Sequence, residues 1–566
     1  EYLFNSARLT PSRLYLNLFS TAMRSPIFCI LLAIGFDTSL AFSVPTVRNA
    51  KFLAGSSSSS NKIIPAIRRQ NNHCRLWAST PAESENDSSD DDSEQDLSEE
   101  KKKSLTNEFI KIGGPALIQL AAEPLAGLID TVYLGRLGTE VLGGAGVAIS
   151  AQYAVSKLYN DPLLRTSISL VASQDGKQRD SATEEQKQMD LSIAVSSALL
   201  LAATVGLIQL VVYTIFCRGI TKTMGVVPSS PMWHSAVSYL QIRALGTPAA
   251  TMWLVTNGIF RGLGDTRTPL VYSLAFTVMN ALFDPMFIFL FGWGASGAAA
   301  GTALAQYIAL VPLILALNKK VPINILGQIK ELKSSLQQYL TAGGMVLFRT
   351  LGKVSAYALC ARQAAVLGPV AAAAYNLTFQ LGFATTQICE AVAVAVQTLM
   401  AREMAAPQTS PRKKAQTVRH LINTAVLSGG GVATALSLLT YYRRDAIVRG
   451  LTNNPATQAA TLSIFPVVLL TQVLKGLAYP VNGIIMGGLD WLNSMAVMWC
   501  ANLSCFGLIR YFARGPNTGV SLAQIWWALA AFMGTQVVAG IIRYESKTGV
   551  WSVLKGGDTT PKEATA

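Results

Sequence analysis

Long apolar blocks, many of twenty residues or more, recur along the chain from Leu105 to Tyr544. A helix needs about 20 residues to cross the ~30 Å hydrocarbon layer of a bilayer, and soluble cores rarely need blocks of this length. The composition agrees, because 51% of the 566 residues are hydrophobic and only 14% are charged, about half the charged share that is usual for soluble proteins. We therefore expect an all-α membrane protein.

Polar breaks divide these blocks into about twelve transmembrane helices, six in each half of the chain. The second block is the least apolar, because Lys157, Asp161 and Arg165 fall inside it. The expected limits are 106–134, 143–172, 191–216, 235–258, 268–292, 295–318, 336–366, 370–400, 419–441, 460–488, 493–513 and 521–543.

The two halves repeat each other. One repeat has an offset of 225 residues and relates Gly258, Gly262 and Asp265 to Gly483, Gly487 and Asp490. A second has an offset of 230 residues and relates Gly113, Gly114 and Gly138 to Gly343, Gly344 and Gly368. With six spans each, the halves have the same topology, and we predict two pseudo-symmetric six-helix lobes around a central cavity. Such lobes can rock about a site near the membrane midplane, which gives alternating access.

The net charge of +14 lies entirely on the membrane part, because residues 1–104 hold 12 basic and 12 acidic residues. The charges occur mostly in short loops, where lysine and arginine set orientation, and no basic patch interleaved with aromatics points to nucleic acid. The loops after even-numbered spans are the more basic ones, so both termini are expected to face the inner compartment. Their basic residues are Arg261, Arg267, Lys319, Lys320, Lys330, Lys333, Arg402, Arg412, Lys413, Lys414 and Arg419, against Arg443, Arg444 and Arg449 on the opposite side.

Residues 1–41 are interpreted as a signal peptide whose expected start is Met23. A positive charge precedes the apolar core Ile27–Phe36, which is too short to span a bilayer comfortably. Ser39 and Ala41 then occupy the two positions before a cleavage site that require small residues.

Residues 42–82 have the composition of a plastid transit peptide. They hold six basic residues, a run of serines at 56–60 and no acidic residue. A signal peptide followed by Phe42 and such a segment resembles the bipartite presequence of algae with secondary plastids. An ordinary secretory signal with a disordered tail is the alternative. We expect a plastid membrane of an alga with a secondary plastid.

An acidic linker at 83–104 is expected to be disordered, because residues 83–100 hold ten acidic residues and many serines. It marks the start of the folded protein. The expected parts that follow are an N-terminal six-helix lobe at 105–318, an inter-lobe loop at 319–335, a C-terminal six-helix lobe at 336–545 and a tail at 546–566.

Acidic and amide residues inside the expected spans are candidates for binding a coupling cation. Glu123 and Asp130 share one helix face, with Gln119 one turn earlier, and Asn280 and Asp284 lie four residues apart in the fifth span. A carboxylate near the bilayer centre costs ~2.5–3.5 kcal/mol on insertion scales and is therefore usually functional. It can load and release a proton as access alternates. The alternative is a structural carboxyl that closes a helix kink at a neighbouring proline.

A second group of polar residues is expected to line the substrate cavity: Gln119, Asn160, Arg349, Lys353 and Glu390. Asn160 precedes Asp161-Pro162, a pair expected to break the second span. Glu390 is the candidate for cation coupling in the C-terminal lobe. Its alternative role is a salt bridge with Arg349 or Lys353 in the seventh span. The charge of the substrate stays open, because acidic residues suit a cation whereas Arg349 or Lys353 could hold an anion.

Four segments carry a family resemblance: EPLAGLIDTVYLGRLG at 123–138, GIFRGLGDTRTP at 258–269, NALFDPMFIF with GWGASGA within 280–298, and EAVAVAVQ at 390–397. In combination and order they resemble the multidrug and toxic compound extrusion (MATE) family, in its DinF-like branch, which includes plant chloroplast members. The resemblance covers about 105–545 and implies a proton- or sodium-coupled antiporter that expels an organic compound. It also implies an N-lobe location for the acids of the first and fifth spans, which agrees with Asp130 and Asp284.

We therefore predict a secondary active transporter that exports small organic compounds by alternating access, with a proton as the expected coupling cation and sodium as the alternative. A lipid-headgroup flippase is a rival function and would need a strongly basic central cavity. A prenyltransferase-like membrane enzyme is another and would need an Asp-rich diphosphate motif, which the sequence lacks. No enzymatic activity, cofactor or metal is expected, since neither a P-loop nor a His/Cys ligand pattern occurs. The expected partners are the bilayer and a small organic substrate, without nucleic acid, and the expected state is a monomer.

Overall fold

The computed structural model of the chain describes residues 97–557 apart from 136, 138, 178–183, 225, 325–328, 408–409, 452–453 and 515–518. The expected signal peptide and transit peptide lie outside the described residues, as does the acidic linker up to residue 96 and the end of the C-terminal tail. These parts therefore remain predictions, as do the exact limits of the predicted domains.

The structure confirms an all-α fold. The α-helices are α3 (Glu99–Gly135), α4 (Thr139–Lys177), α5 (Glu184–Thr223), α6 (Trp233–Leu245), α7 (Thr247–Gly262), α8 (Arg267–Pro285), α9 (Gly294–Lys320), α10 (Ile329–Val366), α11 (Pro369–Ala405), α12 (Pro411–Tyr442), α13 (Arg444–Leu451), α14 (Pro455–Gly487), α15 (Trp491–Ala513) and α16 (Leu522–Glu545). A π-helical turn, η2 (Met286–Leu290), continues α8, and a 3₁₀ segment, η3 (Gly549–Gly557), follows α16.

Each of the twelve predicted spans coincides with one helical crossing, if α6 and α7 are taken as a single crossing. These two helices meet at Gly246, and Pro248 in the first turn of α7 has no N–H with which to continue the hydrogen-bond ladder. By length and apolar composition alone, seven helical segments of the described chain could cross a membrane: α5, α8 with η2, α9, α12, α14, α15 and α16. The long helices α3, α4, α10 and α11 carry most of the candidate site residues.

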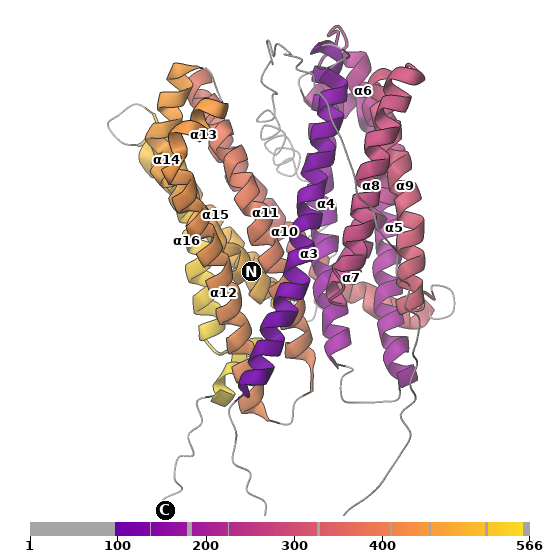
Figure 1. Ribbon diagram of the computed structural model, residues 1–566, viewed down its shortest axis with the longest axis vertical. Helices are drawn as coiled ribbons and strands as arrows, with labels where there is room; N and C mark the ends of the chain where they lie inside the picture. Colours follow the sequence, from indigo (N-terminus) through magenta and orange to yellow (C-terminus); the bar gives the residue numbers. More distant parts are fainter. Residues whose placement is uncertain are drawn as a thin grey trace, which may run out of the picture. The chain divides into compact units, whose positions relative to one another are not determined.

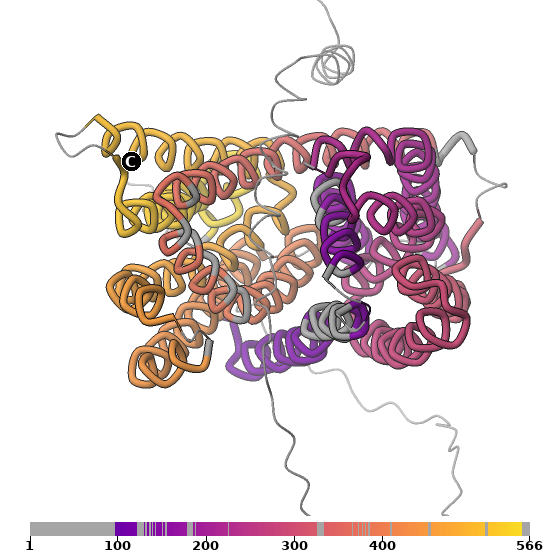
Figure 2. Tube along the Cα trace, turned by 90° about the horizontal axis from the view of Figure 1, so that it is seen from above, coloured from indigo at the N-terminus to yellow at the C-terminus, as the bar shows by residue number. Residues whose placement is uncertain are grey.

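The helices form two lobes (Figure 1, Figure 2). Helices α3–α9 pack on one another, and so do α10–α16. The N-terminal core includes Trp253 and Leu313, and the C-terminal core includes Met498 and Trp526. Across the boundary, α4 contacts α10 and α11, and α3 contacts α11. These four helices therefore place residues of one lobe against the other.

The glycines repeated at an offset of 225 residues have equivalent roles in the two lobes. A β-carbon on Gly258 would lie 3.0 Å from the carbonyl oxygen of Leu164 in α4, and one on Gly483 would lie 2.7 Å from that of Ala393 in α11. Gly262 and Gly487 meet the carbonyls of Ile168 and Gln397 in the same way. The glycines thus allow α7 to touch the backbone of α4, and α14 that of α11. The second repeat shows no such close approach at Gly114, Gly343 or Gly344.

Candidate functional site

Asp130 on α3 and Asp284 on α8 lie together in the N-terminal lobe, joined by Asn280. The side-chain nitrogen of Asn280 donates hydrogen bonds to Asp130 Oδ1 at 2.6 Å and to Asp284 Oδ2 at 3.2 Å. All three side chains are buried. The structure thus brings together three of the four residues predicted to bind a coupling cation. The side chain of the fourth, Glu123, lies outside the described residues.

Two features of neighbouring segments shape this acid pair. After Pro285, α8 continues as the π-helical turn η2, a distortion that is frequent at functional sites. On α9, Gly301 leaves room for the carboxylate, since a β-carbon there would lie 2.6 Å from Asp284 Oδ1. That oxygen accepts no hydrogen bond from any described residue, and Asp284 Oδ2 accepts from Asn280. These bonds do not support the alternative of a carboxyl that closes the kink at Pro285.

A buried arginine adds a positive charge to the same region. Arg243 on α6 donates a hydrogen bond to Gln306 Oε1 at 2.8 Å and interacts electrostatically with Asp130 and Asp284. With both carboxyls ionised, these three charged groups sum to −1. One bound monovalent cation therefore neutralises them.

Gln119 belongs to a separate buried network. Its side-chain nitrogen donates to Asn257 Oδ1 at 3.0 Å and to Ser273 Oγ at 3.2 Å, and its oxygen accepts from Arg261 at 3.0 Å. The assignment of Arg261 to a charged loop is wrong, because α7 extends to Gly262 and buries the arginine inside the lobe.

The predicted break of the second span is also wrong, because α4 runs without interruption through Pro162. A membrane helix tolerates such a proline, and the Pro162 carbonyl accepts a hydrogen bond from Thr166 at 2.8 Å. Asn160 Oδ1 accepts hydrogen bonds from Gln209 at 2.9 Å and from Thr251 at 3.3 Å. Asn160 therefore links α4 to α5 and α7 within the N-terminal lobe.

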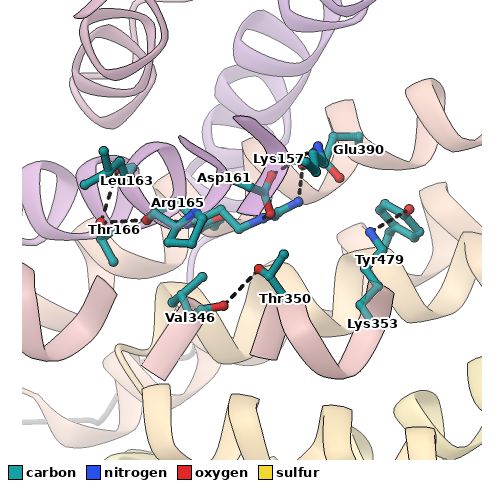
Figure 3. Close-up of polar contacts among 12 residues, drawn as sticks. Lys157, Asp161, Leu163, Arg165, Thr166, Val346, Thr350, Lys353, Glu390 and Tyr479 are labelled. Atoms are coloured by element: carbon teal, nitrogen blue, oxygen red, sulfur yellow. Dashed lines mark hydrogen bonds and ion pairs between the residues drawn. The ribbon is translucent and has the colours of Figure 1, made fainter. Parts of the chain in front are cut away.

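An ion-pair chain connects the two lobes (Figure 3). Arg165 on α4 reaches Asp161 Oδ2 through Nε at 3.1 Å and Glu390 Oε1 on α11 through Nη2 at 2.9 Å. The alternative role for Glu390, a salt bridge with Arg349 or Lys353, is wrong in its partner. Because α4 lies against α11 at the lobe boundary, an arginine of the opposite lobe takes this carboxylate.

Arg349 and Lys353 instead line a small cavity of the C-terminal lobe at its boundary with α4. Lys353 Nζ donates to Tyr479 Oη at 3.3 Å and lies 5.1 Å from the centre of that ring, an approach visible in Figure 3. The free space is about 20 Å³, enough for a water molecule. The cavity is lined by Arg165, Arg349, Lys353, Ala393, Tyr479, Asn482, Met498, Phe532, Met533 and Gln536.

Three residues near these groups were not among the sequence candidates: Arg243, Lys475 and Tyr479. Arg243 falls inside the predicted fourth span and Lys475 inside the tenth. The rule that selected Asp284, an ionisable residue within a span, would have found both if it had been applied to basic residues as well. Tyr479 had no sequence signal, because aromatic residues are common in membrane helices.

Comparison with known proteins agrees with this architecture. The MatE family model matches residues 185–286. The chain is 31% identical to Protein DETOXIFICATION 44, chloroplastic, of Arabidopsis thaliana, over 80% of this chain and 85% of the relative. It is 30% identical to Protein DETOXIFICATION 45, chloroplastic, of the same plant, over 80% and 81%.

A solved structure of similar fold is the Vibrio cholerae MATE transporter VcmN in the bent form. The TM-score is 0.66 at 16% identity, and the match covers 81% of this chain and 99% of the transporter. At this identity the likeness shows the fold. Together with the identity to the plant relatives, it establishes that the chain belongs to the multidrug and toxic compound extrusion (MATE) family of membrane transporters and is not an enzyme.

Proposed function

We propose that the protein is a cation-coupled antiporter that exports small organic compounds across a plastid membrane by alternating access. The observation that carries the coupling is the buried group Asp130–Asn280–Asp284. It joins α3 to α8 within one lobe and holds two carboxyls that share a single amide donor.

The oxygen atoms of this group favour a bound cation. Asn280 Oδ1 and Asp284 Oδ1 are buried and accept no hydrogen bond from the described residues. A buried acceptor without a partner is destabilising, and hard cations take oxygen ligands of this type. Two interacting carboxyls titrate as a pair. A proton or a sodium ion bound there changes the charge of the N-terminal lobe and so shifts the balance between the two lobe arrangements.

Transport in proteoliposomes tests the coupling. Vesicles are loaded with a plastid metabolite extract, and the compounds exported under a pH gradient and then a sodium gradient are quantified by mass spectrometry. The gradient that drives export identifies the cation. We expect Asp130→Asn and Asp284→Asn to lower driven export to the passive leak while protein abundance is retained, since both changes keep the size of the side chain.

Asp190→Asn is the matched control, because Asp190 lies near the start of α5 and bonds only to Gln186 among the described residues. Its export should equal that of the unchanged protein. Normal driven export by Asp130→Asn under both gradients would contradict the N-lobe coupling site, and Glu390 would become the first alternative.

The location rests on the presequence and on the two plant relatives described above, both of which are named chloroplastic. We expect residues 23–82, fused to a fluorescent protein, to enter the plastid of an alga with a secondary plastid. Phe42→Ala should leave the fusion in the endoplasmic reticulum or at the plastid periphery, whereas Ser43→Ala should not. Normal entry of the Phe42→Ala fusion into the stroma would refute the bipartite presequence.

A further inference from the structure

Arg243 on α6 is a buried arginine whose positive charge has no carboxylate partner at short range. It is 9% exposed, and no carboxylate of the described residues lies within ion-pair distance of its guanidinium. Its charge nonetheless acts on both Asp130 and Asp284. A buried charge is strongly destabilising unless other charges compensate it. Arg243, Asp130 and Asp284 therefore form one electrostatic unit.

Helix α9 borders both parts of this unit. Gln306 on α9 accepts a hydrogen bond from Arg243 Nη1 at 2.8 Å. Gly301, five residues earlier on the same helix, lies against Asp284, since a β-carbon there would lie 2.6 Å from Oδ1. Where α6 meets α7, Gly246 leaves room for the guanidinium, because a β-carbon there would lie 2.6 Å from Nη1. The arginine is thus held at a defined place in the same part of the lobe as the acid pair.

The other buried charges in the described part of the N-terminal lobe are engaged elsewhere. They belong to Asp161, Arg165 and Arg261. Asp161 and Arg165 pair with each other, and Arg165 also pairs with the opposite lobe. Arg261 donates to Gln119 in the separate network described above. The acid pair and Arg243 are therefore considered as a unit of their own.

The groups that face Arg243 from the neighbouring helices are uncharged. Tyr239, one turn earlier on α6, interacts electrostatically with Arg243 and with the acid pair. Tyr213 on α5 interacts with Arg243 and with Tyr159 on α4, and α9 contributes the amide of Gln306. Phenols are uncharged near neutral pH. With both carboxyls ionised, the acid pair alone would therefore carry −2, and Arg243 reduces this charge to −1.

These two charge states differ in the cations that they call for. A second negative charge near a carboxylate favours binding of a cation, whereas a fixed positive charge disfavours it. Two carboxyls without a counter-charge would hold a first cation tightly and attract a second. We propose that Arg243 is the built-in counter-charge of the acid pair, which limits the site to one monovalent cation and keeps that cation releasable. This inference rests on the coupling proposed above and assigns its stoichiometry. Arg243 acts through its charge and not by contact with the cation.

Charge-compensating variants test this assignment. Arg243→Gln brings the unit to −2, Asp284→Asn brings it to 0, and the double variant Arg243→Gln/Asp284→Asn returns it to −1. Thermal unfolding of the purified full-length protein in detergent is recorded against pH and against sodium concentration, without a gradient. A cation that binds the folded protein raises its unfolding temperature. The response of Asp130→Asn/Asp284→Asn, which has neither acid, is subtracted, and the midpoint of the remaining rise reports the cation affinity.

We expect Arg243→Gln to shift this midpoint to an at least about tenfold lower cation concentration, which is about one pH unit for a proton, because a nearby positive charge is removed. Asp284→Asn should lose the response, and the double variant should recover it with a midpoint close to that of the unchanged protein. Arg243→Lys keeps the charge and should keep the midpoint. Arg218→Gln is the matched control, because Arg218 is exposed on α5, and it should respond as the unchanged protein does.

A double variant that lacks the response as fully as Asp284→Asn would show that Arg243 acts structurally, and would overturn the proposal. An unchanged midpoint in Arg243→Gln would overturn it as well. If Arg243→Gln does not fold, the double variant decides, because its charge equals that of the unchanged protein. Absence of any cation response in the unchanged protein would contradict the proposed coupling at the acid pair, whereas a response that Arg243→Gln does not move contradicts the counter-charge alone.

Discussion

Arg402, near the C-terminal end of α11, is predicted to hold the two lobes together. Its Nη1 donates to Glu108 Oε1 on α3 at 2.5 Å. Its Nε lies 2.7 Å from Asp175 Oδ2 on α4, an ion pair without hydrogen-bond alignment. Gly264 makes room for it, since a β-carbon there would lie 2.6 Å from Arg402 Nη2. The arginine is thus enclosed by the opposite lobe.

The size of the effect follows from exposure. Each of the two carboxylate side chains is 34% exposed, so water screens both pairs, and each contributes about 0.5–1 kcal/mol. Arg402→Gln removes both and should destabilise this lobe arrangement by about 1–2 kcal/mol, a factor of roughly 5 to 30 in the population ratio. Asp175→Asn removes one pair and should have about half this effect in free energy.

Spin labels at Lys177 on α4 and Lys413 on α12, in a background without native cysteines, report the separation of the lobes at this end. Both side chains are exposed. In double electron–electron resonance, we expect Arg402→Gln to enrich the longer distances between the two labels and Asp175→Asn to do so less. Arg510→Gln, on α15, should leave the distance distribution unchanged. An unaltered distribution in Arg402→Gln would refute the reasoning.

Three further predictions concern the acid pair, the lobe boundary and the topology. Gly301→Ala should displace the Asp284 carboxylate and weaken activation by the coupling cation about tenfold, because the new methyl meets Asp284 Oδ1. Gly219→Ala, which meets nothing within 4 Å, is the control in the same gradient-driven export assay, and equal effects would contradict the account. Glu390→Gln should lower the free energy of unfolding by about 1–3 kcal/mol, and with it the amount of protein in the membrane, because Arg165 loses one charged acceptor. The cation dependence of export should be kept, and a changed cation dependence would reassign Glu390 to coupling. Cysteines at Lys413 and Arg443 should be labelled by an impermeant reagent from opposite sides of sealed vesicles, and labelling from one side only would exclude twelve crossings.

The helices could be predicted from the sequence because the bilayer fixes their length and apolar character. Even α6 and α7, which break at Gly246, correspond to one predicted span, although α7 extends four residues beyond its predicted end. Pro162 was misjudged for a physical reason. Proline often ends helices in soluble proteins, but membrane helices tolerate it, and α4 continues through Pro162. The repeat of Gly258 and Gly483 was readable as spacing, whereas its cause, backbone contact with α4 and α11, needed coordinates.

The candidate site was predictable only where its partners are close in sequence or share a chemical pattern. Asp130 was found as a charge within a span, and Asn280 and Asp284 as an i, i+4 pair, and the structure brings all three together. For Glu390 a salt bridge was only the alternative to a cavity role, and the partner that the structure gives it is Arg165, 225 residues away in the other lobe. Spacing along one helix cannot report contacts between α4 and α11, which depend on how the lobes pack.

The Arg165–Glu390 ion pair makes the charges at the lobe boundary depend on how closely the two lobes approach. Any rearrangement that separates α4 from α11 breaks the Arg165–Glu390 pair and lets water solvate both charges. Closing the lobes again returns Arg165 to the neighbourhood of Arg349, where two guanidinium groups repel each other. The Arg165–Glu390 pair therefore favours the closed arrangement, whereas the repulsion between Arg165 and Arg349 opposes it.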